Sequence, residues 1–266
     1  MRIASLGSGS RGNSTLIATD DTMIMVDCGL PRRETDRRLA RLDVAASSID
    51  AILLTHEHSD HCRGVGAFAG AHDIPVFLTA GTAASQLIPG SLRALTIRPG
   101  DTFAIGDIEV GAEPVPHDAR EPVQFTFRYQ SRKLGVLTDL GSVTPHLAEA
   151  FAGCDALVLE FNHDRNLLAQ GPYPHSVKAR VVGDFGHLAN EQAREFLDLT
   201  DTSRLKVLFV AHMSQQNNHP ELADKVLKDW HARSTCRIVH ASQEEGFDWY
   251  ELEADFAWSS RISQTG

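Results

Sequence analysis

The stretch that decides the fold is Ala51-Ile-Leu-Leu-Thr-His-Glu-His-Ser-Asp-His61. Its apolar first half predicts a short buried strand, and the polar cluster behind it predicts a loop at the end of that strand. Residues two apart in an extended backbone point to the same side, so His56 and His58 can bind one cation together. Asp60 and His61 follow at once and face a second cation if the chain turns there.

This mixture of ligands indicates the class of metal. Imidazole nitrogen combined with carboxylate oxygen suits Zn, Mn, Fe or Ni better than Ca or Mg. The alternative is a set of surface polar residues without a metal, but three histidines and one aspartate within six residues argue against coincidence. We therefore expect two divalent transition-metal ions, Zn or Mn before Fe or Ni. Cys62 beside the motif is a weaker ligand candidate.

The bulk composition is that of a globular protein. The chain has 266 residues, of which 42% are hydrophobic and 23% charged, and one α/β domain can accommodate them. No apolar run approaches the ~18 residues of a membrane span, and the N-terminus lacks a secretory apolar region. We expect a cytoplasmic protein with no membrane partner. Its four cysteines form no C-x-x-C pair, as is typical of reduced thiols.

The net charge of −10 argues against a strong sequence-independent nucleic-acid clamp. It does not exclude a nucleic-acid substrate, because bound divalent cations return about four positive charges to the site.

A glycine-rich loop, Gly7-Ser-Gly-Ser-Arg-Gly-Asn13, joins the first two predicted strands. Successive N–H groups in such a loop can form a concavity for an anion, and Ser8, Ser10 and Asn13 would be further donors. A plain hairpin connection is an equal alternative. The loop is not a P-loop, because no Gly-Lys-Ser/Thr follows it.

Ionisable residues recur at predicted strand ends, where the ligand sites of open α/β sheets gather. Asp27 can orient a ligating histidine from behind. His117, in a rigid proline-flanked loop, is a candidate third ligand of the first metal, although in isolation it would be an ordinary loop histidine. Asp139 has two oxygens and is the candidate bridging ligand, with a turn aspartate as the alternative. The strand-end set is Asp27, His56, His117, Asp139, His163 and His212.

Helical patterns separate the strands. Residues 32 to 42 predict a basic helix whose five arginines form a solvated face or, less commonly, contact a polyanion. Asn190 is the expected N-cap of an amphipathic helix that ends at Leu199. The alternation predicts two β-sheets with helices outside them, in one domain over residues 1–255. We expect its two halves to divide near residues 120 to 130 and a flexible tail at 256–266.

The order of motifs resembles the YycJ/WalJ-like branch of the metallo-β-lactamase fold over nearly the whole chain. The motifs are Ser-Gly-Ser-Arg-Gly-Asn at 8–13, Asp-Cys-Gly at 27–29, Thr-His-Glu-His-Ser-Asp-His at 55–61, Pro-His-Asp-Ala at 116–119, Thr-Asp-Leu-Gly at 138–141, Glu-Phe-Asn-His-Asp at 160–164, Gly-His-Leu-Ala-Asn at 186–190 and Ala-His-Met-Ser-Gln-Gln-Asn-Asn at 211–218. The resemblance implies a four-layer αββα sandwich with metals at one edge.

The resemblance also implies which residues bind the metals. One metal would be held by His56, His58 and His117, and the other by Asp60, His61 and His212, with Asp139 bridging and Asp27 behind them. Members of this branch are associated with metal-dependent DNA exonuclease activity that starts from a 5′ end.

We therefore predict a phosphodiester hydrolase, a 5′-to-3′ DNA exonuclease whose nucleophile is a metal-bridging hydroxide. Two cations can lower the pKa of a shared water from about 16 to about 7 and neutralise charge that develops on the phosphodiester. The predicted catalytic residues are Asp60, His187 and His212. The predicted substrate-binding residues are Ser8, Ser10, Asn13, Asn162, His163, Asp164, Ser214 and Asn218.

The alternative function is hydrolysis of a small ester, thioester or lactone at the same metal site, since a fold alone does not determine a substrate. A metal-stabilised structural protein ranks last, because its ligands would be richer in cysteine. The sequence leaves the oligomeric state open, and a homodimer is compatible with it.

Overall fold

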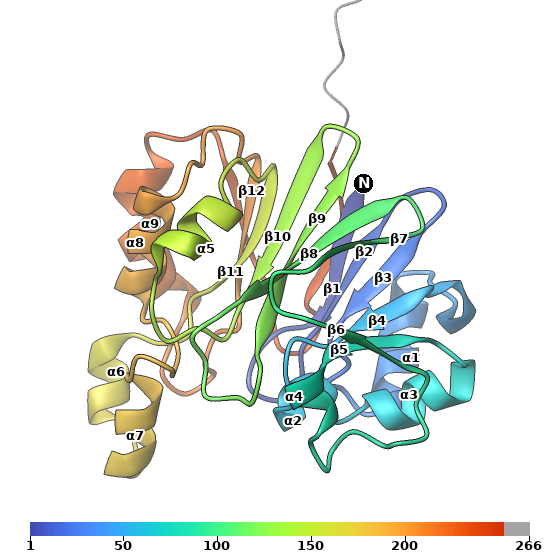
Figure 1. Ribbon diagram of the computed structural model, residues 1–266. Coiled ribbons are helices and arrows are strands. Elements are labelled where there is room, and N and C mark those ends of the chain that lie inside the picture. The colour runs from blue at the N-terminus through green and yellow to red at the C-terminus, as the bar shows by residue number, and fades with distance from the viewer. Residues whose placement is uncertain (253–266) are drawn as a thin grey trace, which may run out of the picture.

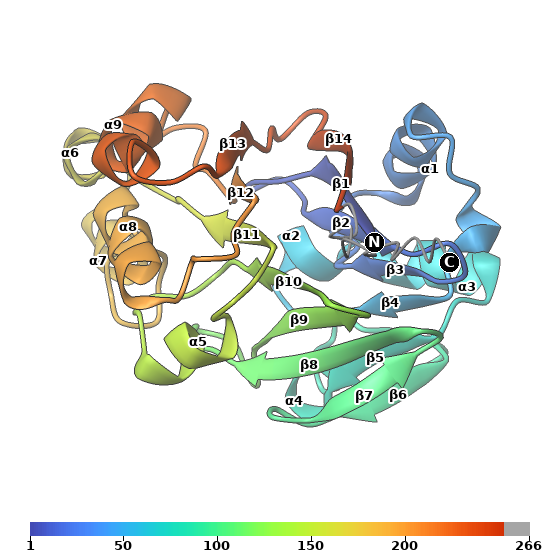
Figure 2. The ribbon, with the colours of Figure 1, turned by 90° about the horizontal axis from the view of Figure 1, so that it is seen from above.

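Two seven-stranded sheets lie face to face, and helices cover the outer face of each (Figures 1 and 2). This computed structural model describes residues 1–252. Its layers, helix–sheet–sheet–helix, confirm the predicted αββα sandwich. The tail expected at 256–266 lies outside the described residues, among which no helix is both long and apolar enough to traverse a bilayer.

The first sheet is built mainly from the N-terminal part of the chain. Its strands are β1 (Arg2–Gly7), β2 (Ser14–Ala18), β3 (Met23–Val26), β4 (Ala51–Leu53), β5 (Val76–Thr79), β6 (Ala94–Ile97) and β14 (Phe247–Glu251). They are ordered β14-β1-β2-β3-β4-β5-β6. The helical segments of this half are α1 (Arg32–Arg41), a 3-10 turn (Ala46–Ser48), α2 (Ser59–Cys62), α3 (Val65–His72) and α4 (Ala80–Ala83).

The second sheet is built from the later part of the chain, and its strands follow one another in sequence order from one edge of the sheet to the other. Its strands are β7 (Thr102–Ile105), β8 (Ile108–Pro114), β9 (Val123–Tyr129), β10 (Arg132–Leu137), β11 (Ala156–Glu160), β12 (Val207–Ala211) and β13 (Arg237–His240). They are ordered β13-β12-β11-β10-β9-β8-β7. The helices of this half are α5 (Pro145–Ala150), α6 (Arg165–Gln170), α7 (His175–Val181), α8 (Asn190–Leu199) and α9 (Pro220–His231).

Three apolar cores separate the four layers. The central core lies between the sheets and contains Phe125, Phe127 and Phe209. One outer core packs helices on the second sheet around Phe196, and the other packs helices on the first sheet around Phe68. A side chain every second residue of β9 enters the central core, as the alternation of a strand requires.

The parallel strands of both sheets end at one edge of the sandwich. Strands β3 to β6 run parallel to one another, and so do β10 to β13. Three residues just beyond strand ends adopt left-handed backbone, with φ of 60° at Asp27, 52° at Asp139 and 50° at His212. This conformation is uncommon outside glycine and concentrates at functional sites. At each of these residues the extended backbone of the preceding strand is therefore interrupted.

Two sequence expectations about the fold are wrong. The chain crosses between sheets from Ile97 to Thr102, not near residues 120 to 130, because the β7–β8 hairpin pairs with β9. Asn190 is the first residue of α8 and not its N-cap. Its side chain is buried and exchanges hydrogen bonds of 3.0 and 2.8 Å with that of Asn218. The sequence reading also missed β6 and α6, which are short.

The arginine-rich helix α1 is not a purely solvated face. Arg38 is buried, and its Nη1 donates to the carbonyl of Leu6 at 2.7 Å and to that of Gln243 at 2.8 Å. The Gln243 side chain in turn accepts from the N–H of Arg11 at 2.7 Å and donates to the carbonyl of Gly12 at 2.9 Å. Arg38 and Gln243 therefore fasten the glycine-rich loop to the body of the protein.

This arrangement predicts that substitution of two neighbouring arginines of α1 lowers the free energy of unfolding by different amounts. Arg38→Met should lower the free energy of unfolding by about 3 kcal/mol, because buried carbonyl groups lose a charged donor. Arg37→Met is the matched control, since Arg37 is exposed and pairs with Glu34 on the surface of the helix. Urea denaturation should leave the control close to the parent protein, and equal losses for both variants would contradict this account.

Candidate metal centre

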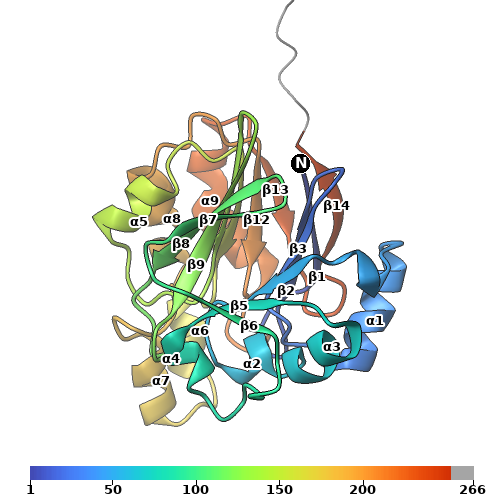
Figure 3. The same ribbon diagram turned by 45° about the vertical axis from the view of Figure 1, so that its right-hand side comes forward.

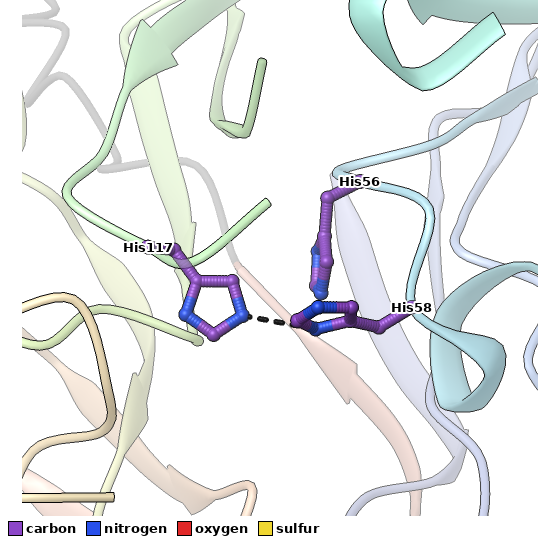
Figure 4. Close-up of side chains that lie close together, drawn as sticks. All are labelled: His56, His58 and His117. Carbon is purple, nitrogen blue, oxygen red and sulfur yellow. Dashed lines mark hydrogen bonds between the residues drawn. The ribbon is translucent and has the colours of Figure 1, made fainter. Parts of the chain in front are cut away.

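Three histidine side chains converge from the two sheets (Figure 4). Nδ1 of His58 lies 3.2 Å from Nε2 of His117. His117 donates from Nδ1 to the carbonyl of Gly186 at 3.1 Å, which leaves a lone pair on Nε2. His56 uses Nδ1 for Thr55 Oγ1 at 2.9 Å, so that its Nε2 faces the same space. Two ligands of a tetrahedral ion with bonds of about 2.0–2.1 Å are about 3.3 Å apart, which fits a shared cation.

A second cluster forms beside the first, from helix α2 and the end of β12. Oδ2 of Asp60 lies 3.3 Å from Nε2 of His61 and 3.5 Å from Nε2 of His212. The other ring nitrogens are engaged away from this point, His61 Nδ1 with Asp27 at 2.8 Å and His212 Nδ1 with Glu160 at 2.9 Å. The three inward atoms are therefore available to one cation.

Asp139 lies between the clusters. Its Oδ2 is 3.3 Å from Nε2 of His61, and its Oδ1 is 3.5 Å from Nε2 of His212 and 3.9 Å from Nε2 of His117. The carboxylate is almost fully buried. Its two oxygens are placed as a ligand shared between two neighbouring cations would require.

Three of the polar atoms that face this space have no hydrogen-bond partner among the described residues. Nε2 of His56, Nε2 of His212 and Oδ2 of Asp139 are buried and lack a hydrogen-bond partner in the described part of the chain. Buried polar groups are rarely left unsatisfied, so a bound cation accounts for all three. The donors are imidazole nitrogens and carboxylate oxygens, which fit divalent transition-metal ions.

Comparison with known proteins agrees with this geometry. Residues 22–213 match the family described as "Beta-lactamase superfamily domain". The exodeoxyribonuclease YycJ of Bacillus anthracis is 37% identical over 222 residues, which cover 82% of this chain and 84% of the relative. The exodeoxyribonuclease WalJ of Streptococcus pneumoniae strain D39 is 33% identical over 261 residues, which cover 95% and 94%. This chain belongs to the YycJ/WalJ branch of the metallo-β-lactamase superfamily.

Solved structures of more distant proteins share its fold. YhfI from Bacillus subtilis superposes with a TM-score of 0.70 at 15% identity and covers 94% of this chain and 99% of its own. Zn²⁺-bound PqqB from Methylobacterium extorquens has a TM-score of 0.68 at 18% identity and covers 95% and 100%. These likenesses confirm the fold of this YycJ/WalJ-branch protein.

Asp27 and Thr55 hydrogen bond to His61 and His56 on the side away from the shared space. Oδ1 of Asp27 accepts from the N–H of Thr55 at 2.9 Å and from its hydroxyl at 3.0 Å. Thr55 thereby links Asp27 to His56. Glycine is required at position 29, since a Cβ there would lie 1.7 Å from the carbonyl oxygen of Asp60. The turn after β3 therefore packs directly against the backbone of the metal motif.

Glu160 is a functional residue that the sequence reading missed. It ends β11, is fully buried, and its Oε1 accepts from Nδ1 of His187 at 2.8 Å and from Nδ1 of His212 at 2.9 Å. Its Oε2 accepts from the N–H of Leu188 at 3.0 Å. Burial opposes its ionisation, but the two histidines lower its pKa to about 2. A carboxylate at a strand end, like Asp139, was the signal that could have revealed it.

The two clusters differ in charge. Burial, reinforced by the neighbouring His61, holds the pKa of His56 well below its usual value, and burial likewise lowers that of His117. Burial also acts against protonation of His61 and His212, but Asp139 and the other carboxylates outweigh it. They raise the pKa of His61 well above normal and that of His212 to about 10. Without a metal, protonation is therefore favoured at His61 and His212 and disfavoured at His56 and His117.

A cleft of about 360 Å³ opens over the clusters. It is lined by the predicted catalytic residues Asp60, His187 and His212. Of the predicted substrate-binding residues, Ser10, Asn162 and Ser214 line it. The others do not, namely Ser8, Asn13, His163, Asp164 and Asn218. Asp164 instead caps α6 by accepting from two backbone N–H groups, and His163 is buried.

The glycine-rich loop also contacts candidate metal ligands. Ser8 Oγ accepts from the N–H of His212 at 2.8 Å, and Asn13 Nδ2 lies 3.2 Å from Nε2 of His61. Backbone N–H groups of the loop also bond within the protein, as from Gly9 to Asn13 Oδ1 at 2.8 Å. A phosphate-binding role for this loop stays a prediction, and Ser10 is the member that faces the cleft.

Removing the charge of Glu160 should weaken metal binding. In Glu160→Gln the side chain keeps its size, but its single amide oxygen must serve two histidine donors without a negative charge. Partners that orient metal ligands typically contribute 10- to 100-fold in affinity, so we expect a loss of about that size in competition with a chromophoric chelator. Glu149→Gln, an exposed change on α5, is the control, and equal affinities for both variants would contradict the role.

The charge difference predicts two metal-binding steps with different pH dependence. A cation must displace the proton from His212, whereas His56 and His117 are already neutral at pH 7. Affinity for the ion at Asp60, His61 and His212 should therefore rise about tenfold per pH unit, for each proton displaced, between pH 7 and about 10. Affinity for the ion at His56, His58 and His117 should change little over the same range. Titration calorimetry of metal-stripped protein in buffers of different ionisation enthalpy measures the protons released. Two steps without proton release would disprove this assignment.

Proposed function

We propose that this protein is a dinuclear-metal-dependent phosphodiester hydrolase, and specifically a DNA exonuclease that acts from the 5′ end. The observation that carries the proposal is the pair of ligand clusters joined by the buried carboxylate of Asp139. His56, His58 and His117 would hold one cation. Asp60, His61 and His212 would hold the other. When bound, two such cations lower the pKa of a shared water to about 7 and neutralise charge on a phosphodiester.

The protein's own groups would orient the metal ligands and protonate the leaving group of the substrate. Asp27 and Glu160 orient His61 and His212 through hydrogen bonds of 2.8 and 2.9 Å. His187 lines the cleft, and because Nδ1 is bonded to Glu160, its Nε2 is the atom left to approach a substrate. That nitrogen would donate a proton to the departing oxygen.

The choice of DNA as substrate draws on the relatives. Both YycJ and WalJ are described as exodeoxyribonucleases, and the matched regions cover 84% and 94% of those proteins. A second candidate, hydrolysis of a small ester, thioester or lactone, is favoured by one observation. Val177 and Val181 contribute apolar surface to the cleft.

The test is degradation of 5′-phosphorylated, 3′-labelled single- and double-stranded DNA by purified protein in Mn²⁺. We expect stepwise release of nucleotides. Asp60→Ala should lower the rate by at least about a hundredfold, since even partners that only orient metal ligands contribute 10- to 100-fold. Metal-stripped protein should be inactive and should recover when Mn²⁺ returns.

Two further comparisons sharpen the result. Replacing the 5′-phosphate by hydroxyl, in parent and Ser10→Ala protein, tests whether Ser10 reads the terminal phosphate. If metal-loaded protein cleaves no DNA but hydrolyses thioesters or lactones, the small-ester function replaces the proposed one.

A further inference from the structure

The segment that walls one side of the cleft packs unusually little against the rest of the protein. Helix α7 contains no buried residue. Six large apolar side chains are exposed among the described residues, and three of them, Val177, Val182 and Phe185, lie in or directly after this helix. Figures 1 and 3 show α7 at the same end of the molecule as α2, which carries the metal motif. Exposed apolar groups gathered beside a metal site indicate a surface that binds something.

One face of this segment lines the cleft. Val177, Arg180 and Val181 are spaced i, i+3 and i+4, and such residues share a face of a helix. Tyr173, just before the helix, lines the same cleft. Lys178 points elsewhere, since its Nζ donates to the carbonyl of Ala169 in α6 at 2.7 Å. The face toward the metal cluster therefore combines an aromatic ring, two valines and a guanidinium.

Arg180 is held in place by the loop that carries a candidate metal ligand. Its Nε donates to Oδ2 of Asp118, and its Nη2 donates to Oδ1 of the same carboxylate at 3.2 Å. Asp118 follows His117 directly, and its Oδ1 lies 3.6 Å from Nε2 of that histidine. A guanidinium has five N–H donors, so three remain for a ligand in the cleft.

We infer that Tyr173, Val177 and Arg180 form a subsite for one terminal nucleotide of a single strand, with the base against Tyr173 and Val177 and a phosphate at Arg180. The inference rests on the proposed nuclease function and specifies how its substrate is held. Aromatic stacking beside a cationic group is the usual means of binding single-stranded nucleic acid without sequence preference. A cleft of about 360 Å³ is near the lower limit of ligand sites, which suits one nucleotide and not a duplex.

The positive charge of Arg180 favours a nucleotide over an apolar ligand in this subsite. A small ester would use the valines and Tyr173 but not a guanidinium that is anchored at the mouth of the metal site. A second copy of this chain would bring further negative charge, because the net charge is −10. A nucleotide uses the whole face, since its base is flat and its phosphate is anionic.

The test compares steady-state kinetics on a single-stranded oligonucleotide and on the same oligonucleotide with an abasic 5′-terminal nucleotide. Tyr173→Ala should raise KM for the oligonucleotide about five- to a hundredfold, as expected for the loss of one stacked base, and leave KM for the abasic substrate unaffected. Tyr173→Phe should retain oligonucleotide KM, because the ring remains. Metal content is measured for every variant.

Arg180→Gln should raise KM for the oligonucleotide and reduce the dependence of log KM on log salt by about 0.7, the contribution of one phosphate contact on a single strand. Arg165→Gln is the matched control. Arg165 is also an exposed arginine paired with one carboxylate, Glu191 at 3.6 Å, but it lies on α6 and outside the cleft.

The outcomes separate the subsite from the proposed function. If parent protein degrades DNA and Tyr173→Ala and Arg180→Gln match the Arg165→Gln control, the subsite is overturned and the nuclease function stands. An equal rise in KM on the abasic substrate, or loss of bound metal, would also overturn it, because these residues would then support the structure of the site and not bind the base. Dimerisation that Tyr173→Ala abolishes would assign this face to a second copy. If parent protein cleaves no nucleic acid, the proposed function itself fails.

Discussion

The structure depends on how a buried carboxylate, Asp139, is balanced by its surroundings. Four imidazole nitrogens lie 3.3 to 3.9 Å from its oxygens, and one of those oxygens has no hydrogen-bond partner among the described residues. A buried charge is costly unless it is paired or coordinates a metal. Histidines that follow β4, β8 and β12 lie next to it, and two of them, His61 and His212, are held by Asp27 and Glu160. The edge of the sandwich is therefore organised by charge compensation, whereas its interior is organised by apolar packing.

Backbone geometry delivers these groups to one place. Each sheet ends its parallel strands at the same edge, and left-handed residues at Asp27, Asp139 and His212 interrupt the extended backbone there. Close backbone packing makes such interruptions compatible with a dense site, as where the carbonyl oxygen of Asp60 leaves no room for a Cβ at position 29. The strain of these conformations is tolerated because two sheets and their cores hold the flanking strands rigidly.

Local spacing explains what could be predicted from the sequence. His56, His58, Asp60 and His61 are close together in the chain, so the segment after β4 and the helical turn α2 bring them to one place. The order of motifs indicated the layers of the fold. Glu160 could not be assigned in this way. It serves His187 and His212, which are 27 and 52 residues away, and only the pairing of β11 with β12 reveals that relation. Arg38 was read as solvated for the same reason, because the carbonyls it binds are distant in sequence.

Chemistry and recognition are supported by different parts of the molecule. The metal-facing residues follow strands whose side chains fill the central core, so their positions are coupled to the stability of the whole fold. Helix α7, by contrast, contains no buried residue. The segment that follows it is held by backbone contacts such as the hydrogen bond of 2.9 Å from the N–H of Asp118 to the carbonyl of Phe185. Its side chains can therefore be exchanged with little effect on packing. A fold built in this way can keep one hydrolytic centre while the residues of a single exposed segment determine which phosphodiester or ester reaches it.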